Sequence, residues 1–165
     1  MSVKKLLYWL LPIGWMGVIF YSSATPYEKQ DIKPFLGSIQ LDFMEPVLEW
    51  ISFTYHHSII SVDELGVNGF IEFFIRKGAH VTVFFLLACF FCIALKKTTK
   101  LDLSRILAWS FLLTVLFAVS DEWHQGMTPN RTPYAGDVLL DSLGAALAMI
   151  LIFFWNKFRD GQKNV

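Results

Sequence analysis

Charged side chains are scarce in this chain, and their scarcity limits the class of protein that it can form. Asp, Glu, Lys and Arg make up 17% of its 165 residues, whereas 55% of the residues are hydrophobic. A soluble domain usually carries about one quarter charged residues. The composition therefore argues against a soluble protein. The formal net charge of zero argues against a nucleic-acid partner, because such partners select for an excess of basic residues.

Cysteine is nearly absent as well. The two cysteines, Cys89 and Cys92, lie in the same apolar run. Their spacing is that of a thioredoxin-like redox motif, but no alternation of strands and helices surrounds them. Two cysteines this close together cannot form a disulfide framework, so we expect both thiols to pack in an apolar interior.

The chain contains long apolar runs with few charged residues. There are four of these runs, Leu6–Tyr21, Gly78–Leu95, Ile106–Val119 and Val138–Trp155. Eighteen helical residues extend about 27 Å, close to the thickness of a bilayer's hydrocarbon core. The third run is short, and we expect its helix to cover 103–121. The sequence thus predicts an all-α fold, a polytopic membrane helical bundle with four transmembrane helices in one domain over residues 1–165.

The first apolar run has an alternative interpretation as a cleaved signal peptide. Lys4 and Lys5 precede it, and the small residues of 22–24 follow it. Trp9 and Trp15, however, are bulky for the core of a signal peptide, and three later runs already require membrane insertion. We therefore expect the first helix to be retained.

The basic residues predict the orientation in the membrane. With the N-terminus in the cytoplasm, nine of the fourteen Lys and Arg residues fall inside, against two of the fourteen Asp and Glu residues. Four of those basic residues lie in the short loop from Lys96 to Arg105, and short loops dominate the positive-inside rule. The prediction is a multi-pass protein of the cell membrane, a partner of the lipid bilayer, with both termini cytoplasmic.

The segment of about 22–70 would then lie outside. Apolar residues recur at helical spacing over 43–51, with acidic residues between them, and Pro46 suits the first turn of a helix. We expect an amphipathic helix at the outer face. Its acidic side would be repelled by anionic lipid, so it should cap the bundle rather than lie on the bilayer.

Ionisable residues gather at the outer ends of the other three predicted helices. The start of helix two would carry Arg76, Lys77 and His80, and the end of helix three would carry Asp121, Glu122, His124 and Gln125. The following loop would contain Arg131, and helix four would begin with Asp137 and Asp141. Such groups are costly near lipid and usually face a protein interior or a polar cavity.

Helical spacing indicates which of these side chains can share a face. Residues three or four positions apart are neighbours on a helix, as Asp137 and Asp141 are, whereas Glu122 turns about 100° away from Asp121. Small residues follow Asp141 at positions 142, 144, 145 and 148, and small residues let membrane helices approach closely. We therefore expect the two aspartates of helix four to face the bundle.

The combined motif resembles the VanZ-like family of bacterial integral membrane proteins. The resemblance rests on Arg76-Lys-Gly-Ala-His80, Asp121-Glu-x-His-Gln125, Arg131, Asp137, Asp141 and Gly144, with Tyr21-Ser-Ser23 at the end of the first helix. It implies a bundle of four to five membrane helices. It also implies a link to low-level resistance to the glycopeptide teicoplanin, but it defines no reaction. The chain departs from the family at 81–85, where relatives often carry a further polar residue, and its outer segment is longer.

Phosphate chemistry is one interpretation of the cluster, with a phospholipid headgroup or a lipid-linked cell-wall precursor as ligand. Arg76, Lys77, Gln125, Arg131 and Glu122 are the candidate substrate-binding residues, because guanidinium and ammonium groups hold phosphate oxygens. The candidate catalytic residues are His80 and His124 as general acid or base, with Asp121 orienting the imidazole.

Metal binding is a further possibility within that interpretation. Asp137 and Asp141 could hold Mg²⁺ or Mn²⁺ through oxygen ligands, as in many phosphoryl-transfer sites. Zinc held by His80, His124 and Asp121 is a weaker alternative, because surplus carboxylates favour harder cations. His56 and His57 in the outer segment are more simply explained as ordinary loop histidines.

Two other interpretations stay open. The same cluster could belong to a non-catalytic interaction protein that modulates drug access or assists cell-wall enzymes. Alternatively, Arg–Asp and His–Asp pairs could have a structural role and lock three helix ends together, with Gln125 completing the hydrogen bonds.

Overall fold

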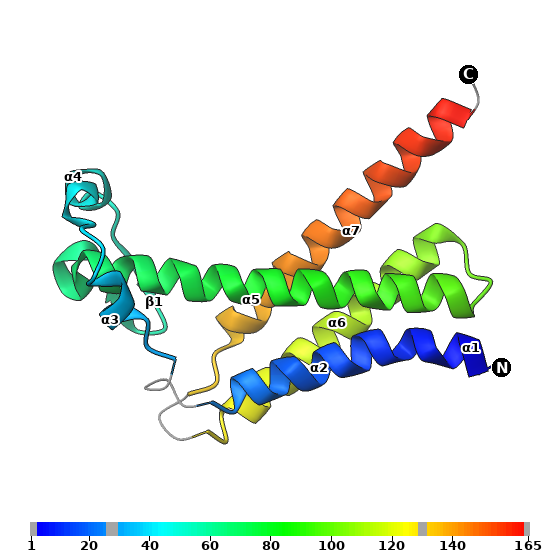
Figure 1. Cartoon of the computed structure of the whole chain (residues 1–165), viewed down its shortest axis with the longest axis horizontal. Helices are drawn as coiled ribbons and strands as arrows, with labels where there is room; N and C mark the ends of the chain where they lie inside the picture. Colours follow the sequence, from blue (N-terminus) through cyan, green and yellow to red (C-terminus); the bar gives the residue numbers. More distant parts are fainter. Residues whose placement is uncertain (1–2, 26–29, 129–131, 164–165) are drawn as a thin grey trace.

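The computed structural model describes residues 3–25, 30–128 and 132–163, and within them the chain is an all-α bundle of the membrane type. The first apolar run forms α1 (Val3–Leu6), the 3-10 turn η1 (Leu7–Trp9) and α2 (Leu10–Ser23), and the other bundle helices are α5 (Val62–Thr98), α6 (Leu103–Gln125) and α7 (Ala135–Lys163). Helix α5 contacts each of α2, α6 and α7, so it is the axis of the bundle (Figure 1).

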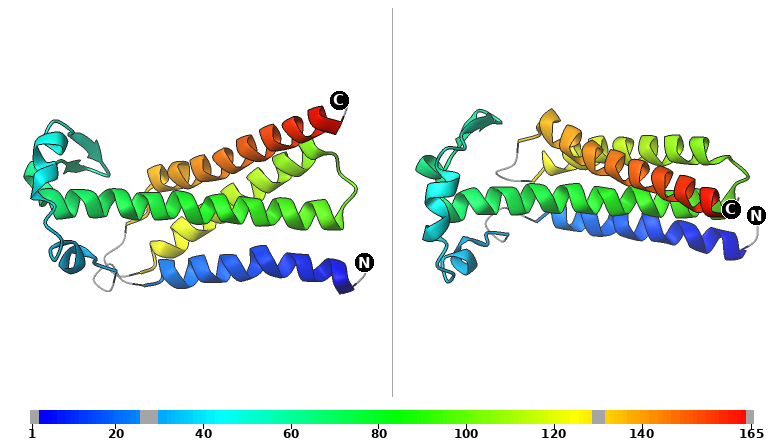
Figure 2. Two further views of the ribbon diagram at one scale, coloured as in Figure 1. Left: turned by 45° about the horizontal axis from the view of Figure 1, so that its top comes forward. Right: turned by 90° about the horizontal axis from the view of Figure 1, so that it is seen from above.

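The two ends of the bundle differ. Both chain termini and the turn between α5 and α6 lie at one end, as Figures 1 and 2 show. At the other end, residues 30–61 gather around the start of α5, and we call them the cap. The cap holds α3 (Lys33–Leu36), the 3-10 turn η3 (Asp42–Met44), α4 (Glu45–Leu48) and an antiparallel hairpin of β1 (Phe53–Tyr55) and β2 (Ser58–Ile60).

The apolar runs were predicted well, but their boundaries were too narrow. Three helices, α5, α6 and α7, are long and apolar enough to cross a membrane, and the run Leu7–Ser23 is shorter. That first run is not uniform, because Pro12 has no N–H to donate to the preceding turn. The backbone forms a 3-10 turn at Leu7–Trp9, shortly before Pro12.

The prediction that Arg76, Lys77 and His80 begin the second helix was wrong, because α5 begins at Val62. Ser61 caps this helix, and its hydroxyl accepts a hydrogen bond from the Glu64 N–H at 3.3 Å. The sequence Ser61-Val-Asp-Glu64 has the spacing of a capping box. At Gly66, with φ of 68°, the helix is broken by a kink that only glycine adopts readily, and it then continues.

The predicted amphipathic helix over 43–51 was also wrong as a single element. The structure has two short turns there, η3 and α4, followed by the hairpin. Pro46 does occupy the first turn of α4, as predicted. The short turns still cap the bundle, because Leu48 and Ile51 pack on a buried cluster of Ile60, Val62 and Phe70.

Two apolar clusters form the core between the helices. One joins α5, α6 and α7, and it includes Cys92, with Cys89 packed against it. The packing of both thiols in this cluster confirms their predicted role as small apolar residues. The other cluster joins α2, α5 and α6 around Phe84, Leu87 and Phe117. At its edge the Trp15 indole N–H donates to the Val83 carbonyl at 2.9 Å and so ties α2 to α5.

Helices α7 and α5 approach each other closely at Gly144 in α7. A Cβ atom added there would lie 2.3 Å from the carbonyl oxygen of Val81 in α5. The α7 backbone therefore rests directly on the α5 backbone, which only a residue without a side chain permits. The predicted packing through small residues of helix four is confirmed at this position.

This contact gives a first prediction. Gly144→Ala should lower the free energy of unfolding by about 1–3 kcal/mol, because the new methyl group must push two packed helices apart. Gly78→Ala is the matched control, since a Cβ on Gly78 in α5 meets nothing within 4 Å. The control substitution should leave the free energy of unfolding unchanged or raise it by up to about 1 kcal/mol. Thermal unfolding in detergent, followed by circular dichroism, measures both, and equal stability of the two variants would contradict the assignment.

Candidate functional site

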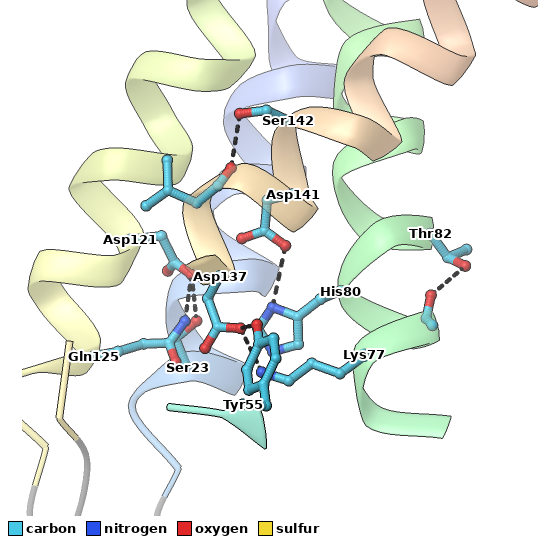
Figure 3. A network of polar contacts seen from close by, with 12 residues as sticks. Ser23, Tyr55, Lys77, His80, Thr82, Asp121, Gln125, Asp137, Asp141 and Ser142 are labelled. Carbon is cyan, nitrogen blue, oxygen red and sulfur yellow. Dashed lines mark hydrogen bonds and ion pairs between the residues drawn. The ribbon is translucent and has the colours of Figure 1, made fainter. Parts of the chain in front are cut away.

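A network of polar contacts lies at the cap end of the bundle, where α5, α6 and α7 meet α2. Figure 3 shows Asp121 of α6 and the two α7 residues Asp137 and Asp141, each with polar partners of its own. Asp121 and Asp141 are almost completely buried, with 0% and 1% of their surface exposed. Buried carboxylates require internal partners, and each aspartate has different ones.

Asp121 connects α6 with α2. Its Oδ2 accepts hydrogen bonds from the Ser23 hydroxyl and from the Gln125 amide, both at 2.9 Å. Asp121 and Gln125 are four positions apart and share a face of α6. The other oxygen, Oδ1, has no hydrogen-bond partner among the described residues. Ser23 was noticed in the sequence only as part of a helix-end motif, and its role as a partner of Asp121 follows from the packing of α2.

Asp141 faces His80. The Nδ1 atom of His80 in α5 lies 3.4 Å from Asp141 Oδ1 in α7, an ion-pair distance when the imidazole is protonated (Figure 3). Asp121 was predicted to orient the catalytic histidine. That assignment was wrong for His80, because the carboxylate behind its ring is Asp141.

Asp137 forms the third set of contacts. Its Oδ1 accepts hydrogen bonds from the Lys77 ammonium and from the Tyr55 hydroxyl (Figure 3). The Lys77 ammonium also lies 4.6 Å from the centre of the Tyr55 ring. Burial raises the pKa of Tyr55, and the hydrogen bond to Asp137 raises it further, so the hydroxyl is a neutral donor. The cap hairpin is thereby fastened to α5 and α7.

Glu122 corrects another expectation. It was predicted to turn about 100° away from Asp121 and to bind substrate, but its side chain is buried, and Oε1 accepts from the Tyr134 N–H at 2.7 Å. It therefore holds the chain just before α7. The sequence could not reveal this contact, because its partner is a backbone group in an irregular loop.

His124 lies apart from these pairs. Its ring packs on Phe20 of α2, with ring centres 4.8 Å apart, and Nδ1 has no hydrogen-bond partner among the described residues. Asp121 accepts its hydrogen bonds from Ser23 and Gln125, and the predicted Asp121–His124 pair is not formed among the described residues. Arg131, predicted to bind phosphate, lies outside the described residues.

Arg76 contacts Glu72 of its own helix. Glu72 is 2% exposed, and its carboxylate lies 3.9 Å from both Arg76 Nη1 and Lys33 Nζ. The i,i+4 spacing of Glu72 and Arg76 is a signal that the sequence does contain. Lys33 and Tyr55 come from the cap, where no periodicity pointed to them.

The carboxylates do not fit the divalent cation site that was predicted for Asp137 and Asp141. Asp137 already holds an ammonium and a phenol, and Asp141 faces an imidazole. No group of three or more His, Cys, Asp or Glu side chains in the described residues is arranged to hold a metal ion. The same finding removes support for zinc on His80, His124 and Asp121, so no chemical step is assigned to a metal.

Two pockets adjoin the network, and we call them the membrane pocket and the cap pocket. The membrane pocket is a cavity of about 190 Å³ between α2 and α5, lined by Val18, Ile19, Ser22, Ser23, Gln30, Arg76, Ala79, His80 and Val83. The cap pocket, of about 410 Å³, lies between the cap and α5, with Lys33, Tyr55, Ser58, Glu72, Lys77 and Asp137 in its walls. Arg76 belongs to both linings.

Together, the fold and the network define a class: an all-α membrane bundle with paired ionisable groups at one end. The family model described as VanZ/LLP1 matches residues 8–156, which is most of the chain. The chain belongs to the VanZ/LLP1 family, as its motif predicted. The comparisons with curated proteins and with solved structures give no match.

The Lys77–Asp137 pair yields a second prediction. Asp137→Asn should lower the free energy of unfolding by about 1–3 kcal/mol, because a half-buried ammonium loses its charged acceptor. Each of the two side chains is only 22% exposed. Asp102→Asn at the opposite end is the matched control, since Asp102 and Arg105 are 58% and 72% exposed.

The control should change stability by less than about 0.5 kcal/mol, because exposed ion pairs contribute little and Asn caps a helix as well as Asp. Chemical denaturation in mild detergent compares the two variants. If Asp102→Asn lowered the free energy of unfolding as much as Asp137→Asn, the Lys77–Asp137 pair would be no more stabilising than an exposed ion pair.

Proposed function

We propose that the membrane pocket binds the headgroup of a phosphate-bearing lipid or lipid-linked precursor. The observation that carries this proposal is the composition of its lining. Among the residues that the structure describes, the ionisable groups in the lining are Arg76 and His80, and no carboxylate lines the pocket. A guanidinium beside an imidazole suits a phosphate, which accepts hydrogen bonds from both.

The lining of the pocket also changes from polar to apolar along its length, as the structure of an amphiphilic ligand does. Ser22, Ser23 and Gln30 line it toward the cap, and Val18, Ile19 and Val83 line it toward the middle of the bundle. Val18 is 54% exposed on the outside of α2, so the pocket borders the surface that faces lipid. A lipid could enter from the side between α2 and α5. Its headgroup would then meet hydrogen-bond donors on the side of the cap, and the rest of the lipid would meet apolar side chains toward the middle of the bundle.

The placement in the membrane is part of the proposal. We infer one domain with four spans, in which Leu7–Ser23, at about 25 Å, is the first and just reaches across the hydrocarbon core. Both termini would be cytoplasmic, because they lie with the basic α5–α6 loop at one end of the bundle. The cap and both pockets would then face the outside of the cell.

Any chemical step in this pocket would use His80. It is the imidazole of the lining, and Asp141 behind it would stabilise the protonated ring. A carboxylate behind an imidazole is the arrangement of many general acids and bases. The geometry supports binding most directly, and turnover of the bound lipid would be the sign of catalysis.

A second candidate role, purely structural, is favoured by one observation. Asp121, Glu122, Asp137 and Asp141 all have partners on other elements, so the cluster ties α2, the cap and α7 to the bundle. In that role the protein would act through its interactions with drug or cell-wall enzymes rather than by binding a lipid. The pocket's cationic lining would then have no ligand.

A lipid-binding measurement separates the two roles. Wild-type protein in detergent should retain phosphatidic acid over neutral diacylglycerol in native mass spectrometry. Arg76→Gln should lower that retention at least tenfold, because a charge-assisted hydrogen bond contributes roughly 1.5–3 kcal/mol. Arg105→Gln, at the opposite end of the bundle, is the matched control and should bind as the wild type does.

Equal retention of phosphatidic acid and diacylglycerol by the wild type would reject the proposal in favour of the structural role. So would equal retention by Arg76→Gln and Arg105→Gln. Unfolding measured on the same samples identifies any loss of binding that comes from a loss of fold.

The glycopeptide link that the family resemblance implies is proposed for this chain as a consequence of the same pocket. Expression in a teicoplanin-sensitive bacterium should raise the minimum inhibitory concentration of teicoplanin. Arg76→Gln, at equal membrane abundance, should not raise it, because the headgroup would no longer be held. Unchanged tolerance with wild-type protein, or equal protection by Arg76→Gln, would contradict this link.

A further inference from the structure

The membrane pocket and the cap pocket follow one another along a single face of α5. Gly69, Phe73 and Arg76 line the cap pocket, and Arg76, Ala79 and Val83 line the membrane pocket. Steps of three or four residues keep these positions on one side of a helix. The two pockets are thus consecutive along α5, and Arg76 stands between them.

We propose that the cap pocket is a second subsite, which takes a hydroxyl-bearing substituent attached to the lipid phosphate. This inference rests on the proposed function of the membrane pocket and deepens it. The ligand class would be a polyol phosphodiester, with glycerol or a sugar on the phosphate, rather than a phosphomonoester.

The position of Arg76 supplies the first argument. A phosphate held by Arg76 would lie where the two linings meet. One helical turn further toward the cap, about 5.4 Å along the axis, the wall of the pocket contains Glu72 and Phe73. A substituent of a few carbon atoms on the phosphate would reach this part of the cap pocket, whereas a bare phosphate would not.

The chemistry of the lining supplies the second argument. The cap pocket combines cations, Lys33 and Lys77, with carboxylates, Glu72 and Asp137. Lys33 is the most accessible of these, with 44% of its side chain exposed. A protonated amine can only donate hydrogen bonds and would be repelled by the cations, and a second, fully ionised phosphate can only accept them and would be repelled by the carboxylates. A hydroxyl both donates and accepts, so it suits both kinds of group at once.

The hairpin supplies the remaining wall. Ser58 of β2 adds a hydroxyl to the lining, and Tyr55 of β1 is held in place by its bond to Asp137. The turn between the strands, His56-His57, has positive φ values of 45° and 64°, which are uncommon outside glycine and asparagine. His56 in this conformation stacks on Tyr134, with ring centres 4.5 Å apart, and so braces the hairpin against the chain entering α7.

Lipid competition tests the inference. The purified protein is given phosphatidylglycerol, phosphatidic acid and phosphatidylethanolamine in equal amounts, and retained lipid is measured by native mass spectrometry. Phosphatidylglycerol should be retained at least about tenfold over each of the others, because hydrogen bonds to charged groups favour its hydroxyls. Lipid that is carried through purification without addition should have a polyol on its phosphate, and its mass distinguishes glycerol from a sugar.

A pair of variants in β2 locates the preference. Ser58→Phe should fill the cap pocket and reduce retention of phosphatidylglycerol to that of phosphatidic acid. Ile59→Phe is the matched control, because neighbouring residues of a strand point to opposite faces and Ile59 is 52% exposed outside the pocket. The control should keep the wild-type preference.

Each other outcome has a definite meaning. Equal retention of phosphatidylglycerol and phosphatidic acid by the wild type would overturn the second subsite while leaving the proposed function standing. Equal retention of phosphatidylethanolamine would overturn the polyol as ligand class. A preference that survives Ser58→Phe would overturn the assignment to the cap pocket, and retention of no phospholipid would overturn the proposed function itself.

Discussion

The contact between α5 and α7 at Gly144 is the constraint on which the rest of the site depends. Because Gly144 has no side chain, α7 lies against the Val81 carbonyl, and the register of the two helices is set there. Both helices run in the same direction along this contact. His80 therefore meets Asp141, and one turn nearer the cap Lys77 meets Asp137. A wider crossing would separate both pairs and leave partly or fully buried charges without partners, which is costly in an apolar bundle.

Pairing of the carboxylates also explains the charge of the membrane pocket. Asp141 stands behind the imidazole of His80, and Asp121 is hydrogen-bonded to Ser23 and Gln125. Neither of these carboxylates enters the lining, in which Arg76 and His80 are the ionisable groups within the described part of the chain. A cluster rich in acids thus borders a pocket whose ionisable lining residues, among those described, are basic. Composition alone would have suggested the opposite, because a count of charges does not say which atoms face a cavity.

Much of the candidate site could be predicted from spacing within single helices. The Asp121–Gln125 pair follows from a four-residue interval, and the position of Asp137 in the first turn of α7 follows from where the apolar run begins. Predictions across helices were less successful. Asp121 was assigned to orient a histidine that Asp141 faces instead, because a helical period says nothing about the register between two helices. The partners Tyr55 and Lys33 come from the cap, where no periodic pattern signals a contact.

The sequence by itself determined the class of fold, the apolar runs and the family. These follow from local composition and from a motif, which can be interpreted without knowing the contacts between distant residues. It also determined that Gly144 and its small neighbours would pack closely. Only the tertiary structure decided which cation meets which carboxylate, how far α5 extends toward the cap, and that Arg76 separates two pockets. Those features depend on the angle, register and depth at which four helices and a cap meet, and residues far apart in the chain set them jointly.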